Sequence, residues 1–146
     1  MFRTLEILTN EAHRLDEKVL QNSVTEAAVL HARNLCEMFL WSVPSKTGKP
    51  KQPRPDDITL PGLFPDWSTN SKYDQIKNEV SNLNRAYGEH DDQNAHNFAF
   101  NKLVMHSTRN RGAYGIYDQA FADLEPIIRK VVGHVESLTD YKFKPI

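Results

Sequence analysis

The longest apolar stripe in the chain runs from Tyr117 to Leu138 and steps by three and four residues, the spacing that lines one face of a helix. Its members are Tyr117, Phe121, Leu124, Ile128, Val131, Val135 and Leu138. Pro126 lies inside the stripe, yet the pattern continues in phase beyond it, so we expect one kinked helix rather than two. A helix this long and this apolar is typical of the central element of a helical core.

Four earlier segments carry the same spacing of apolar residues. They predict helices over about residues 4–20, 23–41, 71–87 and 94–106. No stretch of the chain shows the alternation typical of a strand, and no internal repeat is present. The sequence therefore predicts a single all-α domain over residues 1–146, a bundle of four to five helices.

Local signals set the expected ends of these helices. Ser23 and Glu26 have the spacing of a capping box, so we expect the chain to turn at Gln21–Asn22 and the first two helices to form an antiparallel hairpin. Ser71 and Asp74 form a looser capping pattern at the start of the third helix. Gly88 is well placed to end that helix.

A long proline-rich connection separates the second and third helices, because six of the eight prolines lie between residues 42 and 70. Residues 45–55 are polar and basic, and we expect a mobile arm. Residues 56–67 carry several large apolar side chains, and we expect a cover segment that packs on the bundle. Those side chains are Ile58, Leu60, Leu63, Phe64 and Trp67. Leaving them in water would cost about 1.5–3 kcal/mol each.

Composition and charge narrow the function classes. The formal net charge of -1 provides no overall attraction to nucleic acid or to acidic membranes. Cys36 is the only cysteine, which excludes an internal disulfide and suits a reducing cytoplasm; we expect it to be a small buried apolar residue. The sequence has neither an apolar signal-peptide core nor an apolar run long enough to span a membrane, so we expect no membrane association.

The most unusual chemistry of the chain lies in residues 97–112, NFAFNKLVMHSTRNRG, where a helix is expected to enter a basic turn. No acidic residue occurs between Asp92 and Asp118. The candidate binding residues are Asn101, Lys102, His106, Thr108 and Arg111, and the candidate catalytic residues are His106, Arg109 and Arg111. One interpretation is that these cations, which have no local acids to neutralise them, bind an anionic group such as RNA phosphate.

A structural interpretation of the same residues is equally specific. Asn101 and Thr108 would tie the helix to the following loop through bonds between side chain and backbone. Lys102 and His106 would meet the negative C-terminal end of the helix. The two interpretations remain open at this point.

Other polar residues point to no metal or cofactor. His90, Asp91, Asp92 and His96 follow one another in one polar link with no second cluster, which favours a hydrated hinge over a metal site. His31 falls on the apolar line of the second helix and is interpreted as a histidine at the edge of the core.

Three stretches of the chain carry a resemblance to known proteins. They are HARNLCEMF, DDITLPGLFPDW and NKLVMHSTRNR. These stretches resemble a set of small bacterial all-helical proteins that share an Asn-Lys-x-x-x-His-x-Thr-x-x-Arg string and have no established activity. That string is matched by Asn101, Lys102, His106, Thr108 and Arg111. The resemblance spans about residues 27–135 and implies the fold rather than a reaction.

The chain is more distantly similar to HEPN domains, helical bundles of which many members cut RNA without metal through an Arg-polar-x-x-x-His motif. In such chemistry a histidine near neutral pH moves the proton of a 2′-hydroxyl, while an arginine stabilises charge on the phosphoryl oxygens.

The chain departs from the HEPN motif at its arginine. The Arg position before His106 holds Asn101, and Phe100 precedes it. The motif spacing also occurs at Arg85–His90 and Arg129–His134, but Ala86 replaces the polar residue in the first and the second lies in the most apolar helix. Spacings this loose are expected by chance.

Two function classes follow from the sequence. The first is a binding or assembly module that forms a homo-oligomer or engages a protein partner. The alternative is an RNA-binding protein or a metal-independent HEPN-type ribonuclease that uses His106 with a nearby arginine. A metal-dependent bundle enzyme is disfavoured, because no repeated carboxylate-histidine motif such as Glu-x-x-His occurs.

Overall fold

The computed structural model describes residues 18–41, 57–89, 91–104 and 115–139. Every regular element in these ranges is helical, which confirms the prediction of an all-α fold. The elements are α2 (Lys18–Leu40), α3 (Leu60–Leu63), η1 (Ser71–Tyr73), α4 (Asp74–Tyr87), α5 (His96–Phe98), η2 (Ala99–Val104) and α6 (Gly115–Leu138). None of the described helices is long and apolar enough to cross a bilayer.

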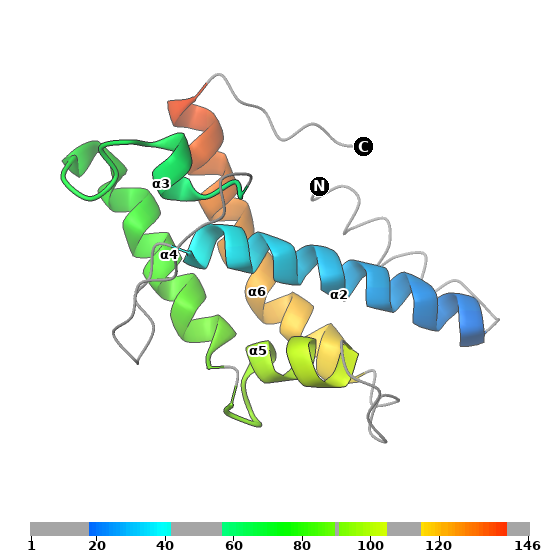
Figure 1. Cartoon of the computed structure of the whole chain (residues 1–146). Helices are drawn as coiled ribbons and strands as arrows, with labels where there is room; N and C mark the ends of the chain where they lie inside the picture. The colour runs from blue at the N-terminus through cyan, green and yellow to red at the C-terminus, as the bar shows by residue number, and fades with distance from the viewer. Residues whose placement is uncertain (1–17, 42–56, 90, 105–114, 140–146) are drawn as a thin grey trace.

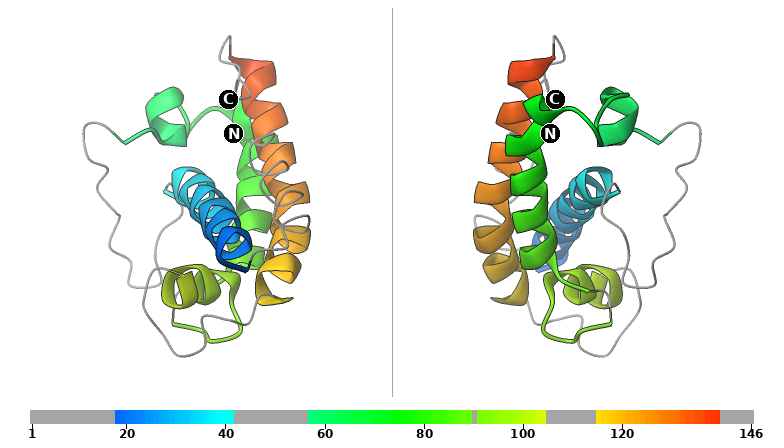
Figure 2. Two further views of the ribbon diagram at one scale, coloured as in Figure 1. Left: turned by 90° about the vertical axis from the view of Figure 1, so that its right-hand side faces the viewer. Right: turned by 90° about the vertical axis from the view of Figure 1, so that its left-hand side faces the viewer.

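The antiparallel helices α4 and α6 form the largest packed pair (Figure 1). Their apolar stripes face each other, and the Lys130 ammonium lies 3.9 Å from Glu79 Oε1 across the pair. Helix α2 crosses the pair on one face, and Figure 2 shows α3 and the α5–η2 segment on that same face, at either side of α2. The molecule therefore has two layers.

The core lies between these two layers. Its largest fully buried side chains come from α2, α3, α4, η2 and α6, so each of these elements contributes to one cluster. They include Phe39, Phe100, Leu35, Leu60, Ile76, Leu83, Leu124 and Ile128. Cys36 is fully buried among them, as expected for a small apolar residue.

The expected turn at Gln21–Asn22 is wrong, because α2 runs without a break from Lys18 to Leu40. Ser23 and Glu26 therefore lie inside a helix instead of at its start. Polar residues inside a helix cost only a few tenths of a kcal/mol each, whereas a break would expose unpaired backbone groups at two new helix ends. A continuous helix therefore has the lower free energy. The rest of the first predicted helix lies outside the described residues.

The C-terminal ends of α2, α4 and α6 agree with the sequence within a few residues, whereas the end of the fourth predicted helix lies outside the described residues. Gly88 ends α4 with a positive φ of 72°, as predicted. The N-cap before α4 differs from the expectation, since Asn70 rather than Ser71 accepts the capping hydrogen bond, from the Lys72 backbone N–H at 3.0 Å. Helix α6 is a single helix with Pro126 inside it, as predicted.

The segment after residues 45–55 meets the bundle through four of its five large apolar side chains. Leu60, Phe64 and Trp67 are buried, and Leu63 is half-buried. Ile58 is 62% exposed, so the expectation that it packs on the bundle is wrong. The short helix α3 is capped by the buried Thr59, whose hydroxyl oxygen accepts from the Gly62 backbone N–H at 3.2 Å. The expected arm over residues 45–55 lies outside the described residues.

Candidate functional site

The sequence-predicted site falls mostly beyond the described residues. Asn101 lies in η2 and is half-buried, and Lys102 is described in its backbone only. His106, Thr108, Arg109 and Arg111 lie outside the described residues, so their convergence into a cleft stays a prediction.

Residues Ala99–Val104 form a π-helical turn that continues directly from α5. Such turns are rare, occur mostly as single turns within α-helices, and are frequent at functional sites. Ala99 and Phe100 anchor this one in the core, since both are buried. The structure thus places an unusual backbone conformation at the start of the stretch that the sequence singled out.

A chain of side-chain amides joins the π-turn to the end of α4. Asn101 Nδ2 donates to the Asn97 carbonyl at 3.0 Å and also to Asn97 Oδ1. Asn97 Nδ2 in turn donates to the Gly88 carbonyl at 3.1 Å, where α4 ends. Asn101 therefore bonds back to the preceding turn, and the expected tie to the following loop stays a prediction, since that loop lies outside the described residues.

Phe100 ties the π-turn to the α4–α6 pair. Its ring centroid lies 6.0 Å from that of Tyr87 in an edge-on arrangement and 6.0 Å from that of Phe121. Edge-on and offset aromatic pairs of this kind contribute about 0.5–1.5 kcal/mol beyond burial. The turn is therefore held by side chains that reach both helices of the pair.

A polar cluster, Arg33, Cys36, Glu37 and Tyr87, occupies the junction of α2 and α4, which we call the α2–α4 junction. One Arg33 terminal nitrogen lies 2.8 Å from Glu37 Oε1, and their side chains are 22% and 39% exposed. Within the described ranges, the Arg33 Nε–H and the Tyr87 hydroxyl are buried and have no hydrogen-bond partner. A buried donor without a partner costs about 1–3 kcal/mol, so two at one junction form an exceptional feature.

Burial dominates the electrostatics of the α2–α4 junction. It raises the pKa of the Tyr87 hydroxyl far above its ordinary value; Cys36 and Glu37 raise this pKa further, and Arg33 opposes them. Burial, and then Glu37, likewise raise the pKa of the Cys36 thiol. Both groups are thus neutral at physiological pH, and Cys36 lacks the thiolate character that a nucleophile needs.

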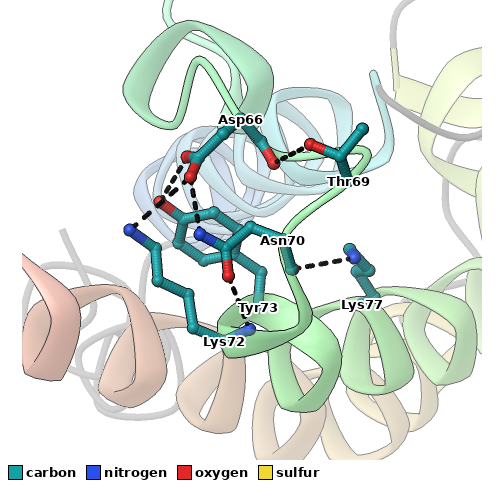
Figure 3. Close-up of polar contacts among 6 residues, drawn as sticks. All are labelled: Asp66, Thr69, Asn70, Lys72, Tyr73 and Lys77. Carbon is teal, nitrogen blue, oxygen red and sulfur yellow. Dashed lines mark hydrogen bonds and ion pairs between the residues drawn. The ribbon is translucent and has the colours of Figure 1, made fainter.

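A second polar cluster lies between α3 and α4, and we call it the Asp66 cluster (Figure 3). The Asp66 carboxylate accepts from Asn70 Nδ2 at 2.6 Å and from the Tyr73 hydroxyl at 2.8 Å. The Lys72 ammonium lies 3.8 Å from the carboxylate and 4.6 Å from the centroid of the Tyr73 ring. The hydrogen bonds from Asn70 and Tyr73 lower the pKa of Asp66.

The Asp66 cluster is structural in character, because its partners are close in sequence and each fixes the chain between α3 and α4. The Tyr73 ring packs below it against Phe64, with centroids 4.6 Å apart, and against Trp67, at 5.8 Å. The cluster holds this aromatic group at the rim of the core and fixes the start of α4.

In the polar link after α4, His96 forms an ion pair with a residue of another helix. His96 Nε2 lies 2.9 Å from Asp123 Oδ2, which connects α5 to α6. No group of three or more metal-ligating side chains occurs among the residues that the structure describes. His96 serves as a cross-link between elements.

Sequence reasoning missed the unpaired donors at the α2–α4 junction. The Arg33–Glu37 pair was expected, at i and i+4, but as a solubilising pair on the surface. Tyr87 entered the argument only as the last member of an apolar stripe. No local signal shows that α2 crosses α4 at this point, so tertiary packing alone reveals the junction.

Comparison with protein-family models, curated proteins and solved structures finds no match. The functional argument therefore rests on the residues themselves.

Proposed function

We propose that this chain is an assembly module that pairs with a second copy of itself through the outer face of α2. The observation that carries the proposal is the position of Leu30, which is 39% exposed near the middle of α2 and points away from the core. At 100° per residue, Leu30 lies roughly opposite the buried line of Ala28, Leu35 and Phe39.

The outer face of α2 includes Ala27, Leu30, Asn34 and the half-exposed Glu37, with Trp41 just beyond the helix end. The spacing on this face is that of a helix-pairing seam. An interval of seven residues separates Ala27 from Asn34 and Asn34 from Trp41, and Leu30 follows Ala27 by three. A helix that carries apolar residues on two faces is stabilised when both faces are buried. Among the described residues, the core covers only one face of α2.

Pairing of two such faces has a defined geometry. Closed dimers commonly have a twofold axis, so the same patch of each copy contributes to the interface. An asparagine within an apolar seam fixes the register of the two helices, because a misaligned copy would leave its amide without a partner. Asn34 is exposed and supplies such a group.

The test is the molar mass of the full chain, measured by analytical ultracentrifugation over a range of micromolar concentrations. The parent is expected to sediment as a dimer that dissociates on dilution. Leu30→Glu introduces two like charges at the seam and is expected to give a monomer with unchanged helical content in circular dichroism.

Ile58→Glu is the matched control, because Ile58 is a large exposed side chain that lies outside α2. This variant should dimerise as the parent does. A parent that remains monomeric at the highest concentration, with no protein that co-purifies, contradicts the proposal. If both variants dimerise less than the parent to the same extent, the interface does not lie on the outer face of α2.

A further inference from the structure

Two hydrogen-bond donors at the α2–α4 junction point to a binding site. Among the described residues, the Tyr87 hydroxyl and Arg33 Nε–H have no acceptor, and Tyr87 is only 3% exposed. Buried donors are almost always paired in folded proteins. A structure that keeps both unpaired loses stability, and a group that brings acceptor oxygens would recover it.

The Arg129–Glu125 pair shows how Arg33 differs from an ordinary helical arginine. Both arginines meet a glutamate at i−4 or i+4, but Arg129 Nε donates to Glu125 Oε1 at 2.6 Å and both side chains are nearly half exposed. In the Arg33–Glu37 pair the glutamate takes a terminal nitrogen, and Arg33 Nε is left buried. Arg33 thus retains a donor on the edge of its guanidinium that Glu37 does not occupy.

The surroundings of the junction add an independent observation. The π-turn η2 packs on α2 and, through Phe100, against the ring of Tyr87. Turns of this type concentrate at functional sites. An unusual backbone conformation and two unpaired donors therefore meet at one place in the fold.

We infer that the α2–α4 junction binds one phosphate or carboxylate group, with Arg33 Nε and the Tyr87 hydroxyl donating to its oxygens. An arginine fork matches both oxyanions in geometry and retains its charge at all physiological pH values. The Glu37 carboxylate competes for the same guanidinium and is 39% exposed, so it turns toward solvent when the ligand enters. Arg33 follows Leu30 by three residues on α2, so the site borders the outer face of that helix.

Thermal unfolding of the full chain tests the inference with inorganic phosphate as the probe. Phosphate is titrated at constant ionic strength against chloride, with acetate as a second arm. A ligand that binds only the folded state raises Tm with concentration. We expect a rise in phosphate or acetate that chloride does not give, and the arm with the larger rise identifies the preferred oxyanion.

Three variants assign the effect to the junction. Arg33→Gln should abolish the anion-dependent rise, and Tyr87→Phe should weaken apparent affinity about tenfold, the effect of losing one hydrogen bond to a charged group. Tyr87→Phe should not lower Tm in chloride, because it removes an unpaired hydroxyl. Glu37→Gln should tighten binding, since it removes the competing carboxylate.

Arg129→Gln is the matched control and should keep the full response. If Arg33→Gln does not fold, Arg33→Lys replaces it, because lysine keeps the charge but lacks the Nε donor. The inference is overturned if the Tm of the parent shows no anion-specific rise. It is also overturned if Arg129→Gln reduces that rise in Tm as much as Arg33→Gln does. It is also overturned if Tyr87→Phe leaves the response intact. Tyr87→Phe should dimerise as the parent does, because its hydroxyl is buried at the end of α4 rather than on the outer face of α2. This separates the anion test from that of the dimer.

Discussion

The Tyr73 hydroxyl donates a 2.8 Å hydrogen bond to Asp66 Oδ1, across the segment that joins α3 to α4. Tyr73 is buried and Asp66 is exposed, so the bond connects the core to the surface (Figure 3). The same carboxylate accepts from Asn70, the residue that caps η1. One side chain at the surface therefore fixes both an aromatic core residue and a helix start.

Acid should weaken the protein through Asp66. The hydrogen bonds from Asn70 and Tyr73 lower the folded-state pKa of this carboxyl below its ordinary value of 3.8. A lowered pKa stabilises the fold above the unfolded-state pKa, and this contribution is lost as the pH falls through the folded-state value. Urea unfolding at a series of pH values below 5 should show a fall in stability that Asp66→Asn reduces. Equal slopes in parent and variant would contradict this assignment.

Tyr73→Phe should destabilise the protein by more than Thr69→Ala does, because it removes the hydrogen bond from the Tyr73 hydroxyl to the Asp66 carboxylate. The exposure of Asp66 limits the size of the loss. Only the hydroxyl is removed, so the packing against Phe64 and Trp67 remains. Chemical denaturation measures the change. Thr69→Ala is the control, because the Thr69 hydroxyl makes only a 3.4 Å exposed contact with the Asp66 carbonyl, and it should shift stability by less than about 0.5 kcal/mol.

Gly88 and Gly133 should respond in opposite directions to alanine. Gly88 has a φ of 72°, and a Cβ there would lie 2.7 Å from the Ala95 Cβ. Gly88→Ala should cost at least about 1–2 kcal/mol from the left-handed backbone alone. Gly133 lies inside α6, and a Cβ added there would meet no atom within 4 Å, so Gly133→Ala should stabilise by about 0.5–1 kcal/mol. Thermal unfolding of the two variants, compared with the parent, shows whether each substitution stabilises or destabilises the protein.

Phe100→Ala should be the more damaging of two substitutions near the π-turn. Phe100 is fully buried between Tyr87 and Phe121, and removal of a buried phenylalanine costs about 3–5 kcal/mol. Phe98 lies two residues earlier and is only half-buried, so Phe98→Ala should cost clearly less. Equilibrium unfolding in urea gives both values. Similar losses would show that the π-turn is not anchored through Phe100.

The ribonuclease alternative predicts that His106→Ala abolishes RNA cleavage in the presence of a chelator. A histidine that moves the proton of a 2′-hydroxyl typically contributes about 10²–10⁴-fold to the rate. Labelled RNA incubated with parent and variant provides the measurement. His134→Ala is a suitable control, since His134 lies in α6. A parent that neither cleaves RNA nor binds it in a salt-dependent way eliminates this alternative.

Periodicity made most of the fold predictable. The stripes of α4 and α6 are long and regular, and the spacing selects most of their buried residues. In α6 it missed the buried Ala120 and wrongly included Leu138, which is 44% exposed. Gly88 was predictable because few other residues adopt its backbone conformation at low cost. These features are local, and a single sequence contains them.

The features that escaped prediction depend on tertiary contacts or on small energy differences. The capping pattern at Ser23 is a true local signal, but the packing of α2 outweighs it. Ile58 resembles its apolar neighbours in sequence, yet it is 62% exposed while Leu60, Phe64 and Trp67 are buried. The Arg33–Tyr87 juxtaposition arises from two helices far apart in the chain, and neither residue is unusual alone.

The burial of Cys36 has a practical consequence. It is the only thiol in the chain, it is fully shielded, and its pKa is raised by burial, so thiol-directed reagents should leave the folded protein unmodified. A cysteine introduced at Gly133, on the open surface of α6, would then be the only reactive position. A spin label attached there would report the distance between two copies by electron resonance, without any change to the native sequence elsewhere.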